Sequence, residues 1–252
     1  MNIAILISGR VCHYSSLLTL LNNNKDNYNI HVFMSVNDND FEFYDKLKDD
    51  LKYFIKGINI SKYEIPPNFY NIFMTKCNNI YNTAQYRTLS MLYNDNKCFN
   101  MAIDYKNKHN IQYDIYLRTR SDIICKDFPF SKYSLKSIND YLYCVNPICK
   151  FTLAITNNPD GEFINGRHHC YGDVKHHGKF VTNDIAFGNE YNMMKYCNCY
   201  DYVLQKNEEY KGNYFICFEY SITTYLEDIN INWVFFDFDY VYIQNRTEYE
   251  IK

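Results

Sequence analysis

The chain alternates between short apolar runs and amphipathic segments, and this alternation predicts an α/β fold. The apolar runs indicate strands, because a strand of a parallel sheet is buried on both faces. The amphipathic segments place apolar residues three or four positions apart, which is typical of helices that cover a sheet. Strands that alternate with helices in this way predict a doubly wound, largely parallel sheet. The expected strands cover residues 3–7, 29–36, 58–65 and 113–118, and the expected helices cover 15–21, 41–56 and 83–108.

The second half of the chain is less regular but continues with the same kinds of element. A glycine- and histidine-containing stretch over residues 155–181 is expected to form a long loop, and no repeat or low-complexity linker divides the chain. We therefore expect one α/β domain over residues 1–252, with a regular half at 1–125 and a more variable half at 126–252. A further strand is expected over 140–145, a short strand or turn over 181–188, and one or two strands over 231–243. Further helices are expected over about 190–205 and 216–227. The long helix over 83–108 allows a break near Asn94.

Composition and charge remove several classes of function. The 252 residues are 47% hydrophobic, which favours a folded globular protein, and the net charge is −3. Nucleic acid is not expected as the principal partner, because binding to a polyanion needs a basic stripe. The apolar run at the N-terminus is five residues long, which is too short for a signal peptide or a membrane span. A cytoplasmic protein without a transmembrane segment is expected, and its oligomeric state stays open.

Ten cysteines are scattered along the chain without a Cys-x-x-Cys pair. In a protein that is not secreted, reduced thiols are the expected state. Four histidines between His168 and His177 surround Cys170. Three interpretations of this segment stay open: a zinc site, a lid that excludes water from a bound ligand, and an ordinary polar loop.

Polar side chains follow the predicted strands at the edge where ligands of open α/β sheets bind. Ser8, Gly9 and Arg10 come directly after the first strand, and Gly9 would let a ligand approach the backbone. Gln85 and Arg87 begin the long helix, where backbone amides and a cation favour phosphate. An ordinary turn and a solvated helix face are the alternatives. Neither Gly-x-Gly-x-x-Gly nor the P-loop pattern occurs, so a dinucleotide-binding or P-loop enzyme is not expected.

The fourth strand ends in Arg118, Arg120 and Asp122. These three side chains share one face if the extended backbone continues past Leu117. Arginine binds phosphate through two parallel hydrogen bonds, and a carboxylate beside phosphate indicates a divalent cation. The pattern predicts a site for a phosphate-bearing ligand, with an Arg–Asp ion pair at the sheet edge as the structural alternative.

Two carboxylates of the second half are candidates for acid–base chemistry. Asp184 lies between an apolar stretch and the small residues of Ala-Phe-Gly, and it could take a proton from an attacking hydroxyl or bind sugar hydroxyls. Glu219 lies in an apolar helical segment and is the second candidate base. A cap or turn role for Asp184, and an ion pair for Glu219, are the alternatives.

Four segments in order resemble GT-A type glycosyltransferase-like proteins of giant DNA viruses and some bacteria. They are "IAILISGR" at 3–10, "AQYRTLSML" at 84–92, "YDIYLRTRSDI" at 113–123 and "NDIAFGNEYNMMKY" at 183–196. The resemblance implies a nucleotide-binding half at 1–125, an acceptor-binding half at 126–252, and transfer of a hexose from a nucleotide-diphosphate sugar, with UDP as the expected nucleotide. The acceptor would be a hydroxyl of a glycan or protein.

The resemblance also implies a metal ligand. Where such enzymes carry Asp-x-Asp, this chain reads Arg120-Ser121-Asp122, so Asp122 would hold Mn²⁺ or Mg²⁺, or Arg120 would itself neutralise the diphosphate. Two other functions stay open: a sugar-1-phosphate nucleotidyltransferase, and a non-catalytic nucleotide-sugar-binding or virion-associated protein. If the chain is viral, the expected location is the host cytoplasm.

Overall fold

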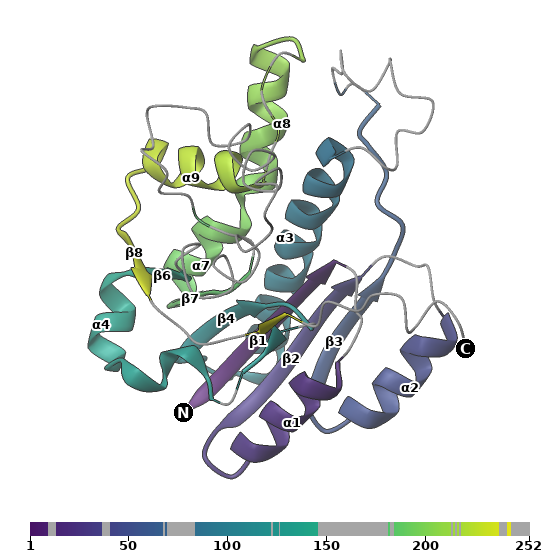
Figure 1. The fold of residues 1–252 in the computed structure, drawn as a ribbon, viewed down its shortest axis with the longest axis vertical. Coiled ribbons are helices and arrows are strands. Elements are labelled where there is room, and N and C mark those ends of the chain that lie inside the picture. The colour runs from purple at the N-terminus through teal and green to yellow at the C-terminus, as the bar shows by residue number, and fades with distance from the viewer. Residues whose placement is uncertain are drawn as a thin grey trace, which may run out of the picture.

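The computed structural model shows a central sheet with helices on both faces (Figure 1). The predicted fold class, a single α/β domain with a largely parallel sheet flanked by helices, is confirmed. The structure describes residues 1–9, 14–36, 41–67, 69, 84–121, 123–125, 127–145, 181, 184–212, 214, 216, 218–236 and 241–242. Its strands are β1 (Asn2–Gly9), β2 (Asn29–Val36), β3 (Ile55–Ile60), β4 (Ile115–Thr119), β5 (Ile123–Ile124), β6 (Leu142–Val145), β7 (Ala186–Gly188), β8 (Trp233–Phe236) and β9 (Val241–Tyr242). Its helices are α1 (Ser15–Asn24), α2 (Phe41–Leu51), α3 (Ala84–His109), the 3₁₀ turn η3 (Pro129–Lys132), α4 (Leu135–Asp140), α7 (Glu190–Cys197), α8 (Cys199–Glu209) and α9 (Phe218–Asp228).

Seven strands form the main sheet in the order β3-β2-β1-β4-β7-β6-β8. The pairs β1–β2, β1–β4, β2–β3 and β6–β8 are parallel. By contrast, β7 runs antiparallel to both of its neighbours, β4 and β6. Its reversed direction places the start of β7 beside the carboxyl end of β4, because Ala186 pairs with Arg118. The short strands β5 and β9 form a separate antiparallel pair.

The sheet separates two hydrophobic cores. Successive side chains of a strand point to opposite faces, so Ile5 of β1 belongs to the core under α1 and α2, and Leu6 belongs to the core under α3, α7 and α9. Residues 3–7 are all fully buried. Burial on both faces explains why this run contains no polar residue.

Several boundaries differ from those that periodicity predicts. The third strand, expected over 58–65, covers Ile55–Ile60 instead. The helix expected over 41–56 ends at Leu51, because the chain from Ile55 onward pairs with β2 as a strand. The long helix α3 continues through Asn94, whose side chain bonds within the helix and to β2 instead of breaking it. The helix expected over 190–205 is two helices, α7 and α8, which meet at Asn198.

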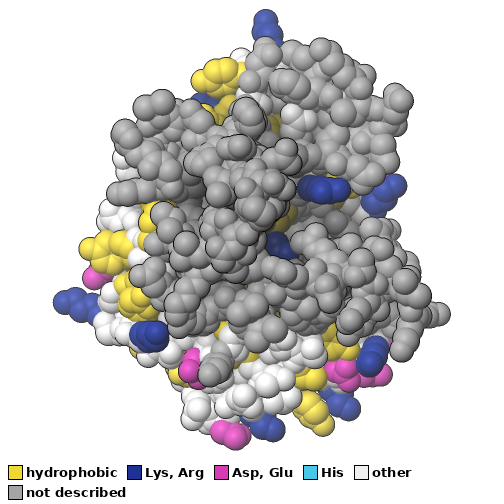
Figure 2. Space-filling view, in the orientation of Figure 1, with side chains coloured by type: hydrophobic (Ala, Val, Ile, Leu, Met, Phe, Trp, Pro, Cys, Tyr) yellow, Lys and Arg dark blue, Asp and Glu magenta, His cyan; other side chains and the backbone are white. Residues whose placement is uncertain are grey.

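The surface of the described residues carries both signs of charge. Figure 2 shows basic and acidic side chains next to one another along the lower edge of this face, in keeping with the net charge of −3. Among the described helices, none combines the length and the apolar composition that crossing a membrane requires.

Candidate functional site

The carboxyl ends of β1 and β4 and the start of β7 meet at one edge of the sheet. Ile7 of β1 pairs with Thr119 of β4, so the two strands end at the same level. Because β7 is antiparallel, its first residues arrive at this edge, and Asp184 lies two residues before the strand. The structure thus brings together Ser8, Arg118 and Asp184, which are far apart in the sequence.

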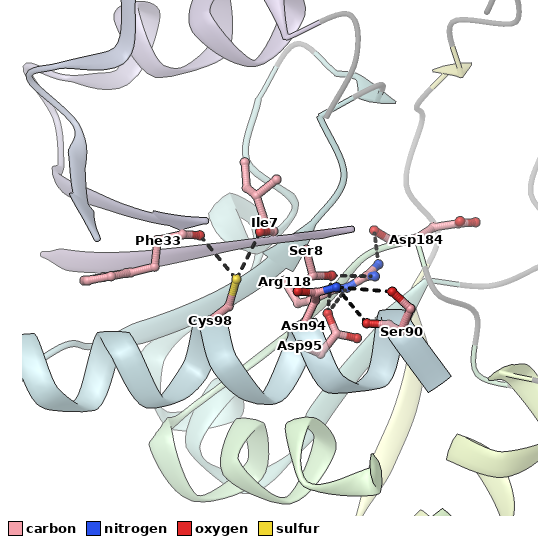
Figure 3. Close-up of polar contacts among 9 residues, drawn as sticks. All are labelled: Ile7, Ser8, Phe33, Ser90, Asn94, Asp95, Cys98, Arg118 and Asp184. Atoms are coloured by element: carbon pink, nitrogen blue, oxygen red, sulfur yellow. Dashed lines mark hydrogen bonds and ion pairs between the residues drawn. The ribbon is translucent and has the colours of Figure 1, made fainter. Parts of the chain in front are cut away.

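Arg118 is the centre of this arrangement, and it is fully buried (Figure 3). Its Nε donates to Asp95 Oδ1 at 3.0 Å, its Nη2 donates to Ser8 Oγ at 3.2 Å, and its Nη1 makes a long contact of 3.4 Å to the carbonyl oxygen of Asp184. The guanidinium carbon lies 5.9 Å from the centre of the Phe218 ring. Arg118 therefore forms a buried ion pair with a carboxylate of α3, which the sequence did not predict. The ion pair expected with Asp122 involves a residue outside the described part of the chain.

Burial is the largest single influence on the pKa of Arg118 and lowers it. The charge and the hydrogen bond of Asp95, together with Tyr196, act in the opposite direction, and the pKa is raised. Asp95 Oδ1 also accepts a hydrogen bond from Ser8 Oγ. The second oxygen, Oδ2, is buried and has no hydrogen-bond partner among the described residues. Such an atom costs free energy, because it has lost water without gaining a donor.

A layer of polar side chains on α3 continues this network across the sheet (Figure 3). Ser35 Oγ of β2 donates to Asn94 Oδ1 at 2.7 Å, and Asn94 Nδ2 donates to the Ser90 carbonyl at 2.7 Å. The Cys98 thiol contacts the Ile7 carbonyl at 3.0 Å, and burial raises the pKa of this thiol. The thiolate is the reactive form of cysteine, and the raised pKa keeps Cys98 in the neutral thiol form. Cys98 is therefore a structural residue whose thiol connects α3 to β1.

Arg120 follows the end of β4, because the strand ends at Thr119 and Ser121 lies in a turn. Asp122, the third residue of the row expected at 118, 120 and 122, lies outside the described residues. Arg120 is half-buried and borders a small cavity of about 10 Å³ together with Leu17 and Leu117. Arg120 is therefore partly accessible at the end of β4, whereas Arg118 is fully buried.

Ser8 and Gly9 contribute in different ways. Ser8 is 6% exposed, and its hydroxyl is used by Asp95 and Arg118. Gly9 has a φ of 85°, which favours glycine over other residues. A Cβ built on Gly9 would meet no atom within 4 Å among the described neighbours.

The start of α3 does not lie at the strand ends. Arg87 is exposed and Gln85 is half-buried, in the first turn of the helix. Asp95, which contacts the end of β1, comes eight residues after Arg87. At a rise of 1.5 Å per residue, Arg87 stands about 12 Å further along the helix axis. These two residues belong to a part of α3 that extends beyond the sheet edge.

The two candidate bases, Asp184 and Glu219, are both largely shielded from solvent. Asp184 is 9% exposed. Glu219 is half-buried in the first turn of α9 and follows Phe218, the residue whose ring faces Arg118. Arg10, Asp122 and the segment 168–177 lie outside the described residues. Within the part of the chain that the structure describes, no three His, Cys, Asp or Glu side chains lie together in a way that would hold a metal ion.

Asp95 was missed by sequence reasoning. Its neighbour Asn94 was interpreted as a possible helix break, yet both side chains face the sheet, where they are 1% and 0% exposed. The available signal was a carboxylate between Leu92 and Cys98, on the apolar side of a long helix. A buried carboxylate needs a cation partner, and Arg118 supplies it.

No protein-family model matches the sequence, and a search of curated proteins found no match. Among solved structures, the fold is similar to a nucleoside-diphosphate-sugar pyrophosphorylase from Vibrio cholerae RC9, with a TM-score of 0.47, 9% identity and 98% of each chain covered. It is also similar to a glycosyltransferase involved in the glycosylation of the major capsid of PBCV-1, with a TM-score of 0.41, 11% identity, and 94% of this chain and 82% of that chain covered. A third is the galactosyltransferase LgtC in complex with donor and acceptor sugar analogs, with a TM-score of 0.43, 12% identity, and coverage of 93% and 73%.

Proposed function

We propose that the protein transfers a sugar from a nucleotide-diphosphate-sugar donor to a hydroxyl of a glycan or protein acceptor. The observation that carries this proposal is the meeting of Ser8, Arg118 and Asp184 at the carboxyl edge of a largely parallel sheet. Ligands of open α/β sheets bind beyond that edge. The four sequence segments that resemble GT-A type glycosyltransferases include these three residues.

In this proposal the donor lies beside Gly9, with its diphosphate near Arg120 and Arg10. Negative charge grows on the diphosphate as the bond to the sugar breaks, so fixed cations nearby lower the barrier. Gly9 and the backbone after β1 contact the base or ribose of the nucleotide. A UDP-sugar is the donor we expect, and a hexose is the sugar.

Asp184 is the proposed base. Asp184 lies two residues before the reversed strand β7, at the edge where β4 ends, and this position supports a role for its carboxylate there. There it takes the proton of the acceptor hydroxyl, or holds hydroxyls of the donor sugar. Glu219, at the start of α9, is the second candidate.

A divalent cation fits the proposed chemistry through Asp122. Carboxylate and phosphate oxygens are the ligands that Mg²⁺ and Mn²⁺ prefer, and the cation would share the charge of the diphosphate. Because Asp122 is outside the described residues, the metal stays a proposal. Its test is donor turnover in the presence of a chelator, followed by addition of Mn²⁺ or Mg²⁺.

The experiment that tests the function is a donor-hydrolysis assay with a panel of UDP- and GDP-sugars, with and without Mn²⁺. Release of free UDP or GDP supports the proposal. Pyrophosphate release from a nucleoside triphosphate and a sugar-1-phosphate would instead assign a nucleotidyltransferase. No turnover and no thermal shift with any nucleotide would assign a non-catalytic protein.

Single substitutions connect this activity to the site. We expect Asp122→Ala and Asp184→Asn each to abolish donor turnover without lowering the melting temperature by more than a few degrees. A folded Asp122→Ala variant with full activity would remove Asp122 from the mechanism. The proposed location is the cytoplasm, that of the host cell if the chain is viral.

A further inference from the structure

We propose that Asp95 and Arg118 are positioning residues, whose buried ion pair holds Ser8 and the segment of Asp184 in place at the carboxyl edge. The inference rests on the proposed function, because it assigns the pair to the same site. It adds a role for α3 that neither the motifs nor the strand ends indicate.

One guanidinium group contacts three separate segments of the chain. Arg118 uses Nε for Asp95, Nη2 for Ser8 and Nη1 for the main chain of Asp184. These three partners come from α3, from β1 and from the segment before β7, while Arg118 itself belongs to β4. The planar fork of arginine fixes the directions of its donors, so a single side chain sets the relative positions of four segments.

The buried ion pair contributes geometry more than net stability. The side chains of Arg118 and Asp95 are 1% and 2% exposed. Removing two charges from water costs as much as their attraction returns, so a buried pair adds little net stability. The orphaned Oδ2 of Asp95 adds a further cost. What the pair does supply is a defined geometry.

Three ionisable groups that surround the pair are uncharged. Tyr196, Cys98 and Cys197 are all fully buried around it, and burial raises the pKa of each of these groups. They are therefore neutral at physiological pH. Arg118 and Asp95 thus balance one another, and removing one of them alone would leave an uncompensated charge in the core.

The test replaces the pair as a unit. We expect the double variant Asp95→Leu/Arg118→Met to fold, with a melting temperature at or above that of the wild type, because apolar replacements of buried pairs are often neutral or stabilising. Its kcat for the donor should fall about 100-fold, the cost of a misplacement of about 1 Å, with a smaller change in KM. A purely structural role predicts a change in stability with kcat retained.

Two single variants sharpen the test. Arg118→Lys keeps a cation for Asp95, but one ammonium group cannot reach Ser8, Asp95 and Asp184 in the directions that the fork does. We expect a lower kcat in a folded protein. Lys106→Met is the matched control, because it removes a partly exposed pair with Glu190 (2.7 Å) from the far end of the same helix. Its turnover should equal that of the wild type.

The outcomes separate the pair from the proposed function. A double variant that folds and turns over donor at the wild-type rate overturns the positioning role, as does an equal loss in Lys106→Met. If the wild type turns over no donor, the proposed function fails, and amide hydrogen exchange over residues 184–188 decides the positioning role. Faster exchange in Arg118→Lys than in Lys106→Met supports the role, and equal exchange overturns it.

Discussion

His31 of β2 is buried among aromatic rings at the end of the sheet opposite the candidate site. Its Nδ1 lies 2.7 Å from the hydroxyl of Tyr113, and the rings of Tyr105 and Tyr113 meet it edge-on at 5.3 and 5.6 Å. Burial, and to a smaller extent the charges of Lys56 and His109, lower the pKa of His31 from 6.5 to about 4. This histidine is therefore neutral in the folded protein at physiological pH.

The buried histidine makes stability dependent on pH. The unfolded chain binds a proton near pH 6.5 and the folded chain near pH 4, so the free energy of unfolding falls as the pH drops through this window. The loss should reach about 3 kcal/mol below pH 4. We expect His31→Gln to flatten this part of the profile, measured by urea denaturation between pH 7 and pH 4.5.

A matched variant at the surface provides the control for His31. His109 is exposed at the end of α3. His109→Gln should change the profile much less than His31→Gln does, because the charge of His109 is the smallest of the three causes that lower the pKa of His31. Equal slopes in the wild type and in His31→Gln would show that other groups cause the acid sensitivity.

At the scale of elements, the second half of the fold depends on capped helix starts. Asn189 precedes α7, and its Oδ1 accepts from the backbone N–H of Asn192 at 2.8 Å. Its Nδ2 donates to the carbonyl of Asn139 at 3.0 Å, so the same side chain connects α7 to the end of α4. Gly188, just before the cap, packs closely, because a Cβ there would lie 3.2 Å from Asn192 Cβ.

Loss of this cap should destabilise the fold without affecting the site. We expect Asn189→Ala to lower the free energy of unfolding by about 1 kcal/mol, measured by urea denaturation. Asn189→Asp keeps the acceptor for the N–H of Asn192 and should cost less. Equal losses in both variants would assign the effect to the contact with Asn139. Donor turnover should be unchanged in both, because Asn189 follows the end of β7 that is distant from Asp184.

At the scale of the whole molecule, the candidate site exists only in the folded chain. Its side chains come from β1, α3, β4 and the segment before β7, which meet through parallel and antiparallel pairing. A ligand that binds this site binds the folded state alone. It must therefore raise the stability of the domain in proportion to the logarithm of its concentration.

Nucleotide binding should be visible as global stabilisation. At a UDP concentration of 100 times Kd, the gain is about 2.7 kcal/mol, which thermal unfolding detects as a rise in melting temperature. The Asn189→Ala variant should start from a lower melting temperature and show the same rise, since its cap is remote from the site. No rise at millimolar UDP or GDP would contradict a nucleotide site.

Local patterns in the sequence were enough to predict the fold class and the edge that carries the candidate site. Hydrophobic period and length are properties of a segment, so β1, β2 and β4 and most helices follow from them. The end of α2 was predicted wrongly, because pairing of residues from Ile55 onward with β2 outweighs helical spacing. Once a strand is predicted, the residues at its carboxyl end are known as well. Ser8 and Gly9 were identified as edge residues in this way, because they directly follow the strand predicted over 3–7.

The partner of Arg118 and the direction of β7 depend on contacts between distant segments. Asp95 lies 23 residues from Arg118 along the chain, and no local pattern pairs a carboxylate of a helix with a cation of a strand. Likewise, side-chain alternation is the same in either direction, so the three residues of β7 do not reveal that the strand runs against its neighbours. Its antiparallel pairing with β4 and β6 brings Asp184 to the edge beside Ser8 and Arg118.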